Sequence, residues 1–436
     1  MRKLRQIVLV LGDVCLAYLA LFLTVVFGFW GNFSWQIFWQ HFLPFSFLYL
    51  FWFIIFFIFG LYDLNLIRPK TEFLGRIGQA FLLCLGLGIA FFYIIPFFGI
   101  TPKVNLLINI IIFAALISVW RRYFYHLFSS FYLQNIAFLG ENHLAKVLVK
   151  EIESQSHLGY KFVKFLDPKK SLFSQLKARD IDSLIIAQDI TSQSKLVQEL
   201  YKCLPLKINF MDLAQIYELL LHKVPIDFLS QSWFLKNLRE GEKKIYDNIK
   251  RIEDIILAFI IITLTSPLWL IFSIFIKLED KGPVFYKQER VGKDKKVFLL
   301  WKFRSMKPDS EKRGKPRWAQ IKDPRVTKIG RFLRRSHLDE VPQMLNVLKG
   351  DISLTGPRPE RPEFVKKLEK EIPHYHLRHI IKPGFTGWGQ IKFRYARSIM
   401  DSHEKFQYDL YYIKNRSLFL DLGILLKTFY LFFKSD

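Results

Sequence analysis

The residues best suited to chemistry in this sequence are two adjacent acids, Asp339 and Glu340, within a strongly basic segment. Residues 277–350 contain 21 Lys and Arg against nine Asp and Glu. The nearby Arg334 and Arg335 are expected to keep Asp339 ionised near neutral pH. An ionised carboxylate beside a metal-binding carboxylate can attack a phosphorus atom, so the pair is a candidate for phosphoryl transfer.

The local sequence predicts that this pair stands at the start of a helix. Because Pro342 is tolerated only within a first helical turn, we expect the helix to begin at Glu340, with Asp339 as its N-cap, and to end at Gly350. The helix N-terminus would also favour an ionised Asp339. A purely structural role for Asp339 stays open, since most Asp residues before a helix only cap it.

Short clusters rich in Gly, Pro, Lys and Arg surround the pair. They are Gly282–Gln288, Lys302–Met306, Asp323–Thr327, Leu338–Gln343 and Gly356–Pro359. Basic residues at this density suit a polyphosphate substrate or anionic lipid headgroups. Nucleic acid is the third alternative, which the lack of a recognition-helix or zinc-finger pattern disfavours.

The bulk composition hides a segregation of apolar and charged residues. The 436 residues carry 63 Lys and Arg and 38 Asp and Glu, a net charge of +25, yet residues 1–130 hold only three acids. This segregation excludes a disordered chain and a simple cytosolic enzyme. The three cysteines, Cys15, Cys84 and Cys203, form no disulfide framework and no zinc-site spacing.

Four apolar stretches near the N-terminus have about the length that a membrane span requires. They are Ile7–Trp30, Phe42–Leu61, Ile77–Phe98 and Val104–Trp120. Basic residues precede the first, separate the second from the third and follow the fourth, so we expect both ends in the cytoplasm. A signal peptide, the alternative for the first stretch, lacks a small-residue cleavage site.

A fifth apolar stretch, Ile255–Ile276, is predicted to enter the membrane and return to the same side. Basic residues flank it at both ends, and Ser266-Pro267 lies at its middle, where proline breaks or bends a helix. A kinked ordinary span is the alternative. The C-terminal run Leu418–Phe433 is interrupted by Asp421 and Lys427; we interpret it as an interfacial amphipathic helix, with a true span as the alternative.

Residues 134–238 predict an α/β unit with a parallel sheet. The turn after the first strand carries one glycine, Gly140, where a dinucleotide-binding fingerprint has three, and Glu141 would repel a pyrophosphate. We therefore expect a Rossmann-like regulatory or assembly module with a degenerate nucleotide site. This module is also a candidate for homodimer formation.

The stretch from Tyr246 to Phe433 resembles the catalytic domain of bacterial polyprenyl-phosphate phosphoglycosyl transferases, the bacterial sugar transferase family. The clusters above, with Ser266-Pro267 and Lys382–Gly387, occur in the family's order. The N-terminal spans and the α/β unit are similar to its long form. The resemblance implies a membrane protein with a transmembrane region at 1–130, a Rossmann-like module at 131–240 and an α/β catalytic domain at 241–436.

The resemblance also implies a reaction at the bacterial inner membrane. Asp339 would attack a nucleotide diphosphate sugar, such as a UDP-sugar, and form an aspartyl–phosphosugar intermediate. Polyprenyl (undecaprenyl) phosphate would then attack this intermediate and accept the sugar-1-phosphate. Glu340, with Asp339, would hold Mg²⁺. Phosphate-binding or fold-locking residues would be Lys302, Arg304, Arg325, Arg334, Pro357, Arg358 and Pro359. His337 stands where the family often has Ser.

Three other functions fit the sequence less well. A membrane-tethered nucleotide-sugar epimerase or dehydratase needs a glycine-rich loop before its Tyr-x-x-x-Lys pair, and none precedes Tyr246 and Lys250. A CDP-alcohol phosphotransferase needs a long Asp/Gly/Ala/Arg motif with several aspartates along helices, and the sequence contains no such motif. A non-catalytic scaffold would not need an acid pair within a basic domain.

Overall fold

The computed structural model describes residues 2–63, 71–94, 103–130, 133–154, 159–177, 181–187, 194–307, 325–393 and 398–433. The chain divides into two compact units, Met1–Ile216 and Tyr217–Asp436, which are described separately. Two residues of the Asp323–Thr327 cluster, Asp323 and Pro324, lie outside the described residues.

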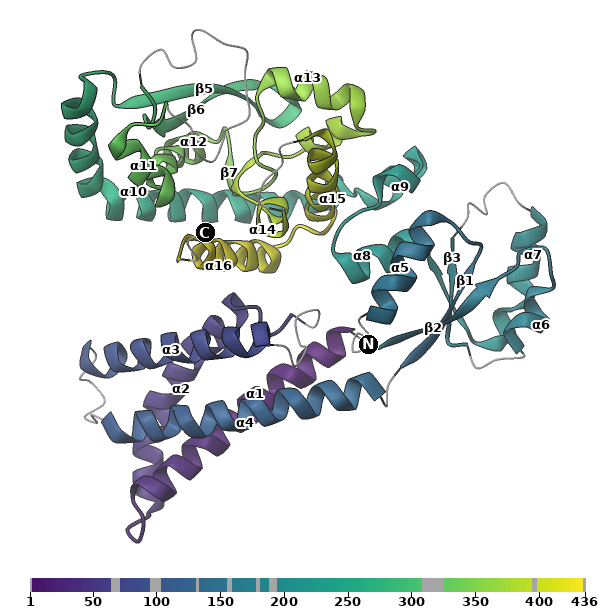
Figure 1. Cartoon of the computed structure of the whole chain (residues 1–436), viewed down its shortest axis with the longest axis horizontal. Helices are drawn as coiled ribbons and strands as arrows, with labels where there is room; N and C mark the ends of the chain where they lie inside the picture. Colours follow the sequence, from purple (N-terminus) through teal and green to yellow (C-terminus); the bar gives the residue numbers. More distant parts are fainter. Residues whose placement is uncertain are drawn as a thin grey trace. The chain divides into compact units, whose positions relative to one another are not determined.

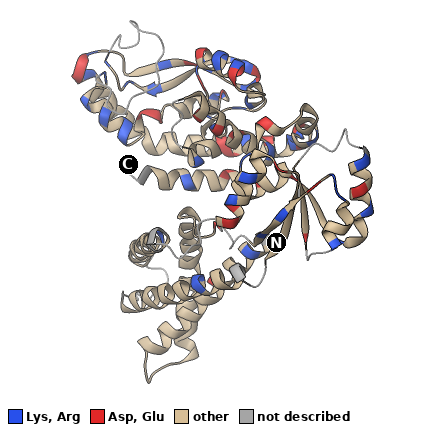
Figure 2. Ribbon diagram, turned by 45° about the vertical axis from the view of Figure 1, so that its right-hand side comes forward, with Lys and Arg blue, Asp and Glu red and all other residues tan. Residues whose placement is uncertain are grey.

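Four long apolar helices form the start of the first unit (Figure 1). They are α1 (Arg2–Gly28), α2 (Trp35–Ile58), α3 (Thr71–Ile94) and α4 (Lys103–Ser130). All four are long and apolar enough to cross a membrane, and Figure 2 shows few charged residues on them. The four predicted spans are confirmed as helices, and the chain is a multi-pass membrane protein.

Two charged residues in the middle of these helices are paired with each other. The Arg121 guanidinium of α4 lies 2.6 Å from the Asp13 carboxylate of α1, and both side chains are buried. Asn109 Nδ2 donates to Thr24 Oγ1 at 3.1 Å on the same pair of helices. Polar groups within a membrane bundle require such partners, so Asp13 is compatible with a spanning helix.

The rest of the first unit contains a four-stranded parallel sheet in the order β2-β1-β3-β4, which confirms the predicted parallel sheet. The strands are β1 (Gln134–Leu139), β2 (Tyr160–Leu166), β3 (Ser183–Ile186) and β4 (Asn209–Asp212). The helices are α5 (His143–Ser154), α6 (Leu172–Lys177), α7 (Ser194–Lys202) and α8 (Leu213–Leu221), the last of which continues into the second unit.

A single side chain joins the carboxyl ends of β1 and β3, the position where open α/β sheets bind ligands. Asn142 Oδ1 accepts from the Ala145 N–H at 2.8 Å, and Asn142 Nδ2 donates to the Ala187 carbonyl at 2.6 Å. Asn142 therefore satisfies one of the N–H groups of α5 that would otherwise meet a phosphate.

The second unit is mainly helical with two small sheets. Its strands are β5 (Phe285–Val291) and β6 (Val297–Phe303), which are antiparallel, and β7 (Ser353–Thr355) and β8 (Gly384–Thr386), which are parallel. Its helices are α9 (Gln231–Asn237), α10 (Lys244–Asp280), α11 (Lys328–Arg335), α12 (Gln343–Lys349), α13 (Pro362–Glu371), α14 (Trp388–Lys392), α15 (Ile399–Asn415) and α16 (Leu418–Phe433).

Helix α10 contains the fifth apolar stretch and continues through Ser266-Pro267 without interruption. Because Pro267 has no N–H, the Thr263 carbonyl loses its helical donor. Ser266 Oγ takes that place and donates to the Thr263 oxygen at 2.8 Å. In Figure 1 the ribbon of α10 runs along the base of the unit and then turns toward β5.

One face of α10 is apolar and exposed along most of its length. The exposed residues are Ile252, Ile255, Ile256, Phe259, Ile260, Leu264, Leu268, Leu270, Ile271, Ile274, Phe275 and Leu278. The opposite face contributes Ala258 to one core cluster and Phe272 and Ile276 to another. This division fits a helix that lies between lipid and protein, and its re-entrant path stays a prediction.

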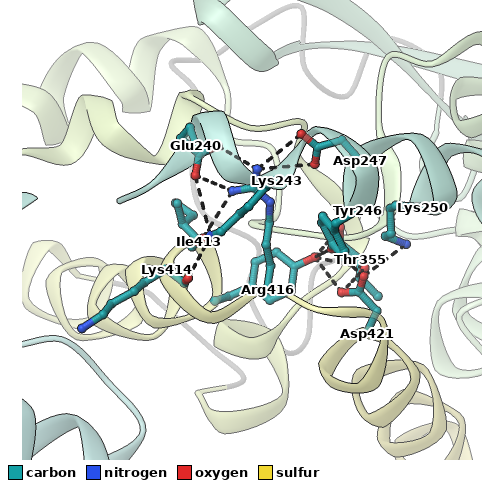
Figure 3. A network of polar contacts seen from close by, with 11 residues as sticks. Glu240, Lys243, Tyr246, Asp247, Lys250, Thr355, Ile413, Lys414, Arg416 and Asp421 are labelled. Carbon is teal, nitrogen blue, oxygen red and sulfur yellow. Dashed lines mark hydrogen bonds and ion pairs between the residues drawn. The ribbon is translucent and has the colours of Figure 1, made fainter. Parts of the chain in front are cut away.

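Asp421 of α16 is fully buried, although the sequence presents it as a break in an apolar run. Its carboxylate accepts from Tyr412 at 2.7 Å, Thr355 at 2.8 Å and Tyr246 at 2.6 Å (Figure 3). Lys250 lies 3.8 Å away and is also paired with Asp254 at 2.8 Å. This network ties α10, β7, α15 and α16 together.

The re-entrant path predicts that residue 281, just after α10, is accessible from the cytoplasmic side of the membrane only. In a cysteine-free background, Lys281→Cys should resist an impermeant thiol reagent added to intact cells and react after permeabilisation. Asn32→Cys, in the predicted external loop between α1 and α2, should react in intact cells and serves as the matched control. Labelling of residue 281 from outside would establish an ordinary span instead.

Candidate active site

The acid pair lies in a tight turn between α11 and α12, not at the start of α12. Leu338–Glu340 form a 3₁₀ turn, and the α-helix begins at Gln343. The expected helix start at Glu340 and the N-cap role of Asp339 are therefore wrong. The cause is Pro342, which cannot donate to the Leu338 carbonyl; the Val341 N–H donates to it instead, at 3.3 Å.

Glu340 is held between two cations from different strands. Lys302 Nζ, on β6, donates to Glu340 Oε1 at 2.6 Å. Arg358, in the loop after β7, donates to both carboxylate oxygens, with 3.2 Å from NH1 to Oε2. Burial alone would raise the pKa of Glu340, but the charges of Arg358 and Lys302 outweigh burial and hold this pKa well below its usual range.

Asp339 differs from its neighbour because its carboxylate has no hydrogen-bond partner within the described part of the chain. Its exposed fraction is 7%. Burial and, to a smaller extent, the Glu340 charge raise the pKa of Asp339 to about 6, against the opposing charges of Lys302 and Arg334. The expectation that Asp339 is ionised near neutral pH is compatible with this pKa, because a carboxyl group with a pKa of about 6 is mostly ionised at pH 7; burial nevertheless makes the ionised form less favourable than in a free aspartate.

The other predicted arginines have separate roles in the structure. Arg334 Nε donates to Ser305 Oγ at 2.8 Å, and its charge acts on Asp339. Arg304 is buried and paired with Asp280 at the end of α10, so it locks the fold. Arg325 gives its carbonyl to the Lys307 N–H at 3.0 Å. The structure brings Lys302, Arg334 and Arg358 to the acid pair and assigns Arg304 to α10.

The predicted prolines shape the loop that carries Arg358. The Pro357 carbonyl accepts from the Gly384 N–H at 2.9 Å. The Pro359 carbonyl accepts from Arg290 NH1 at 2.9 Å. The sequence analysis missed Arg290 and also Arg378, which donates a hydrogen bond to the Arg358 carbonyl. No local motif marks either residue. Ser266 and Pro267 lie in the middle of α10 and belong to its membrane-facing structure.

The donor set is compatible with a hard cation that also binds substrate. Within the described ranges no group of three or more His, Cys, Asp or Glu side chains forms a metal site. Mg²⁺ in phosphoryl-transfer enzymes commonly uses one or two carboxylates and completes its shell with water and substrate phosphates. Asp339 and Glu340 supply two such carboxylates, and none of the described residues donates a hydrogen bond to Asp339.

Comparison with known proteins shows what the second unit is similar to. Residues 245–435 match the family described as bacterial sugar transferase. The UDP-N-acetylgalactosamine-undecaprenyl-phosphate N-acetylgalactosaminephosphotransferase of Aeromonas hydrophila is 45% identical over 229 residues, 52% of this chain and 53% of the relative. The match thus spans about half the length of that relative.

Two further relatives match the same part of the chain. The putative undecaprenyl-phosphate N-acetylgalactosaminyl 1-phosphate transferase of Bacillus subtilis (strain 168) is 51% identical over 150 residues, 34% of this chain and 79% of the relative. The UDP-glucose:undecaprenyl-phosphate glucose-1-phosphate transferase of Escherichia coli (strain K12) is 43% identical over 182 residues, 41% of this chain and 39% of the relative.

The opposite pKa directions of the pair predict opposite effects on stability. A pKa raised from 3.8 to about 6 means that the ionised Asp339 opposes folding above pH 6. Asp339→Asn should therefore raise the free energy of unfolding at pH 7.5, by up to about 3 kcal/mol. The gain should shrink as the pH falls below 6 and vanish well below 3.8, where both states hold the proton.

Glu340→Gln is the matched comparison, because it leaves Lys302 and Arg358 without their buried counter-charge. It should lower the free energy of unfolding by about 3 kcal/mol at pH 7.5. Thermal and denaturant unfolding in detergent at several pH values measure both changes. A destabilised Asp339→Asn protein at pH 7.5 would contradict the raised pKa.

Proposed function

Because the chain belongs to the bacterial sugar transferase family, we propose that it transfers a sugar-1-phosphate from a UDP-sugar to undecaprenyl phosphate. The names of its relatives supply both substrates. This reaction would be the first membrane step in the assembly of an exopolysaccharide or another surface glycan. The catalytic unit would face the cytoplasm, where the nucleotide sugar is soluble.

The observation that carries the proposal is the buried carboxylate of Asp339, which has no hydrogen-bond partner among the described residues, beside a fixed Glu340. Asp339 Oδ attacks the β-phosphorus of the donor, and the bond from this phosphorus to the oxygen bridging to the α-phosphate breaks. UMP leaves with that oxygen and its electron pair. A phosphate oxygen of undecaprenyl phosphate then attacks the aspartyl-bound phosphorus, which releases Asp339 as a carboxylate and requires no proton transfer.

The surrounding cations explain why a pyrophosphate would bind here. Lys302, Arg334 and Arg358 bring three positive charges against the two acids. Lys302 and Arg358 are already aligned by Glu340, so they need little reorganisation to meet charge that develops on the leaving phosphate. Glu340 would act as the fixed anion that orients both cations.

Mg²⁺ is proposed as the cofactor, held by Glu340 and Asp339 together with donor phosphates. When bound, it would neutralise charge on the pyrophosphate. For the sugar, we take an N-acetylgalactosamine donor as the first to test, because two relatives with 45% and 51% identity are named for it. UDP-glucose is the second, named for relatives with 43% and 44% identity.

The alternative functions are a nucleotide-sugar modifying enzyme and a non-catalytic assembly scaffold. A modifying enzyme would change the sugar and keep the nucleotide diphosphate intact. A scaffold would release no nucleotide at all. Release of UMP that depends on undecaprenyl phosphate therefore separates the proposed transferase from both.

The covalent route predicts a burst. Purified protein given donor without lipid should release about one UMP per active site and retain phosphosugar on Asp339, detectable by mass spectrometry of its peptides. Asp339→Asn should give neither, with turnover lowered by at least about a thousandfold, because an amide does not attack phosphorus.

Asp294→Asn is the matched control, since Asp294 is exposed in the β5–β6 turn with φ 53°, a conformation that Asn adopts readily. It should behave like the wild type. Near-normal turnover by folded Asp339→Asn would refute the nucleophile; an adduct on Glu340 would exchange the roles of the two acids.

The metal proposal predicts that excess chelator abolishes turnover and that added Mg²⁺ restores it. Glu340→Gln should lose most activity, about a hundredfold or more, and should require a higher Mg²⁺ concentration for what is left. Initial rates of UMP release over a Mg²⁺ titration measure both effects. Full activity in chelator would remove the metal from the mechanism, and an unchanged Mg²⁺ dependence would remove Glu340 from the metal site.

A further inference from the structure

The loop that presents Arg358 to Glu340 is held almost entirely through its backbone carbonyls. Residues 357–360 give four consecutive carbonyl oxygens to four different donors. These are the Gly384 N–H, Arg378 NH2, Arg290 NH1 and the Val291 N–H, each at 2.9 Å. The donors come from β8, the turn Tyr375–His379, and β5, of which β5 is far from the other two in the sequence.

The sequence of the loop explains why the carbonyls matter. Pro357 and Pro359 have no N–H, so neither can be fixed by donating a hydrogen bond. Proline also fixes its own φ and biases the preceding residue toward extended conformations. The remaining freedom lies in the orientation of the peptide planes on either side of Arg358, and the carbonyl hydrogen bonds set that orientation.

Arg378 is the more constrained of the two arginines. It is 4% exposed and lies 3.0 Å from Asp409 of α15, which is 3% exposed. It also donates to the Tyr375 hydroxyl at 2.6 Å. Burial of an ion pair seldom adds net stability compared with apolar residues of the same size. The rigid fork of donors that Arg supplies, by contrast, can hold Asp409, Tyr375 and the Arg358 carbonyl at once.

Arg290 holds the next carbonyl, that of Pro359. Its NH2 donates to Gln288 Oε1 at 2.6 Å, and its NH1 also lies 3.7 Å from Glu360. Arg290 therefore fastens the Pro359 peptide to β5, the partner of the strand that carries Lys302. Strand β5 and this loop thus fix the positions of Lys302 and Arg358 relative to each other.

We propose that Arg378, fixed by Asp409, and Arg290 are positioning residues that aim Arg358 at Glu340 and at the donor phosphates. Among the described residues neither arginine donates a hydrogen bond to the acid pair, so their hydrogen bonds act through Arg358, although the charge of Arg290 also reaches Glu340. The inference rests on the proposed transferase function, and it assigns the buried Arg378–Asp409 pair a role in the reaction rate.

A double-mutant cycle tests this dependence. Arg378→Lys keeps the charge and removes the fork. It should lower kcat/KM for UMP release at least tenfold in the wild-type background and less than twofold in an Arg358→Ala background. Arg239→Lys, at an exposed position, is the control and should change neither. Thermal unfolding of each protein is measured in parallel, because a purely structural role would lower stability equally in both backgrounds.

Arg290→Lys enters the same cycle and keeps the test decisive if Arg378→Lys does not fold. The positioning role would be overturned if each substitution lowered kcat/KM by the same factor in both backgrounds. It would also be overturned if folded Arg378→Lys and Arg290→Lys proteins lost no kcat/KM. In both cases the proposed function would still stand. If the wild type releases no UMP with any donor in the presence of undecaprenyl phosphate, the proposed function fails, and the inference fails with it.

Discussion

The site depends on one interaction, the Glu340 carboxylate held between Lys302 and Arg358. Lys302 comes from a strand of the antiparallel hairpin and Arg358 from the loop after a separate parallel strand, so a single side chain joins the two small sheets. Because its counter-charges are close, Glu340 stays ionised despite its burial. The same contacts leave the cations aligned before a substrate arrives.

Asp339 shows the other result of the same environment. It is adjacent to Glu340 in a single 3₁₀ turn, yet no residue in the described ranges donates a hydrogen bond to it, and its pKa moves in the opposite direction. Two carboxylates with separated pKa values are a common arrangement where one acid reacts and the other orients. The turn, rather than a helix N-terminus, creates this difference, because it places Asp339 toward the buried side without capping N–H groups.

The sequence was sufficient for features that depend on composition and local pattern. Apolar length predicted the helices α1 to α4, and alternating strand and helix signals predicted the parallel sheet. The adjacent acids within a basic segment indicated the candidate site, whose role in the reaction stays a prediction. It was insufficient where long-range contacts decide. Arg304 pairs with Asp280 and Arg378 with Asp409, and neither partner can be chosen from spacing. Pro342 was recognised as a constraint, but the shift to 3₁₀ bonding that it causes was not.

The burial of Asp421 has a consequence for how the chain is made. Tyr246 and Lys250 leave the ribosome about 175 residues before the carboxylate that they share, a delay of roughly 10 to 35 s at typical synthesis rates. During this interval α10 is already available for insertion, and Lys250 is neutralised only by Asp254 within the same helix. Helix α16, which is synthesised after α10 and α15, thus completes the attachment of α10 through Asp421.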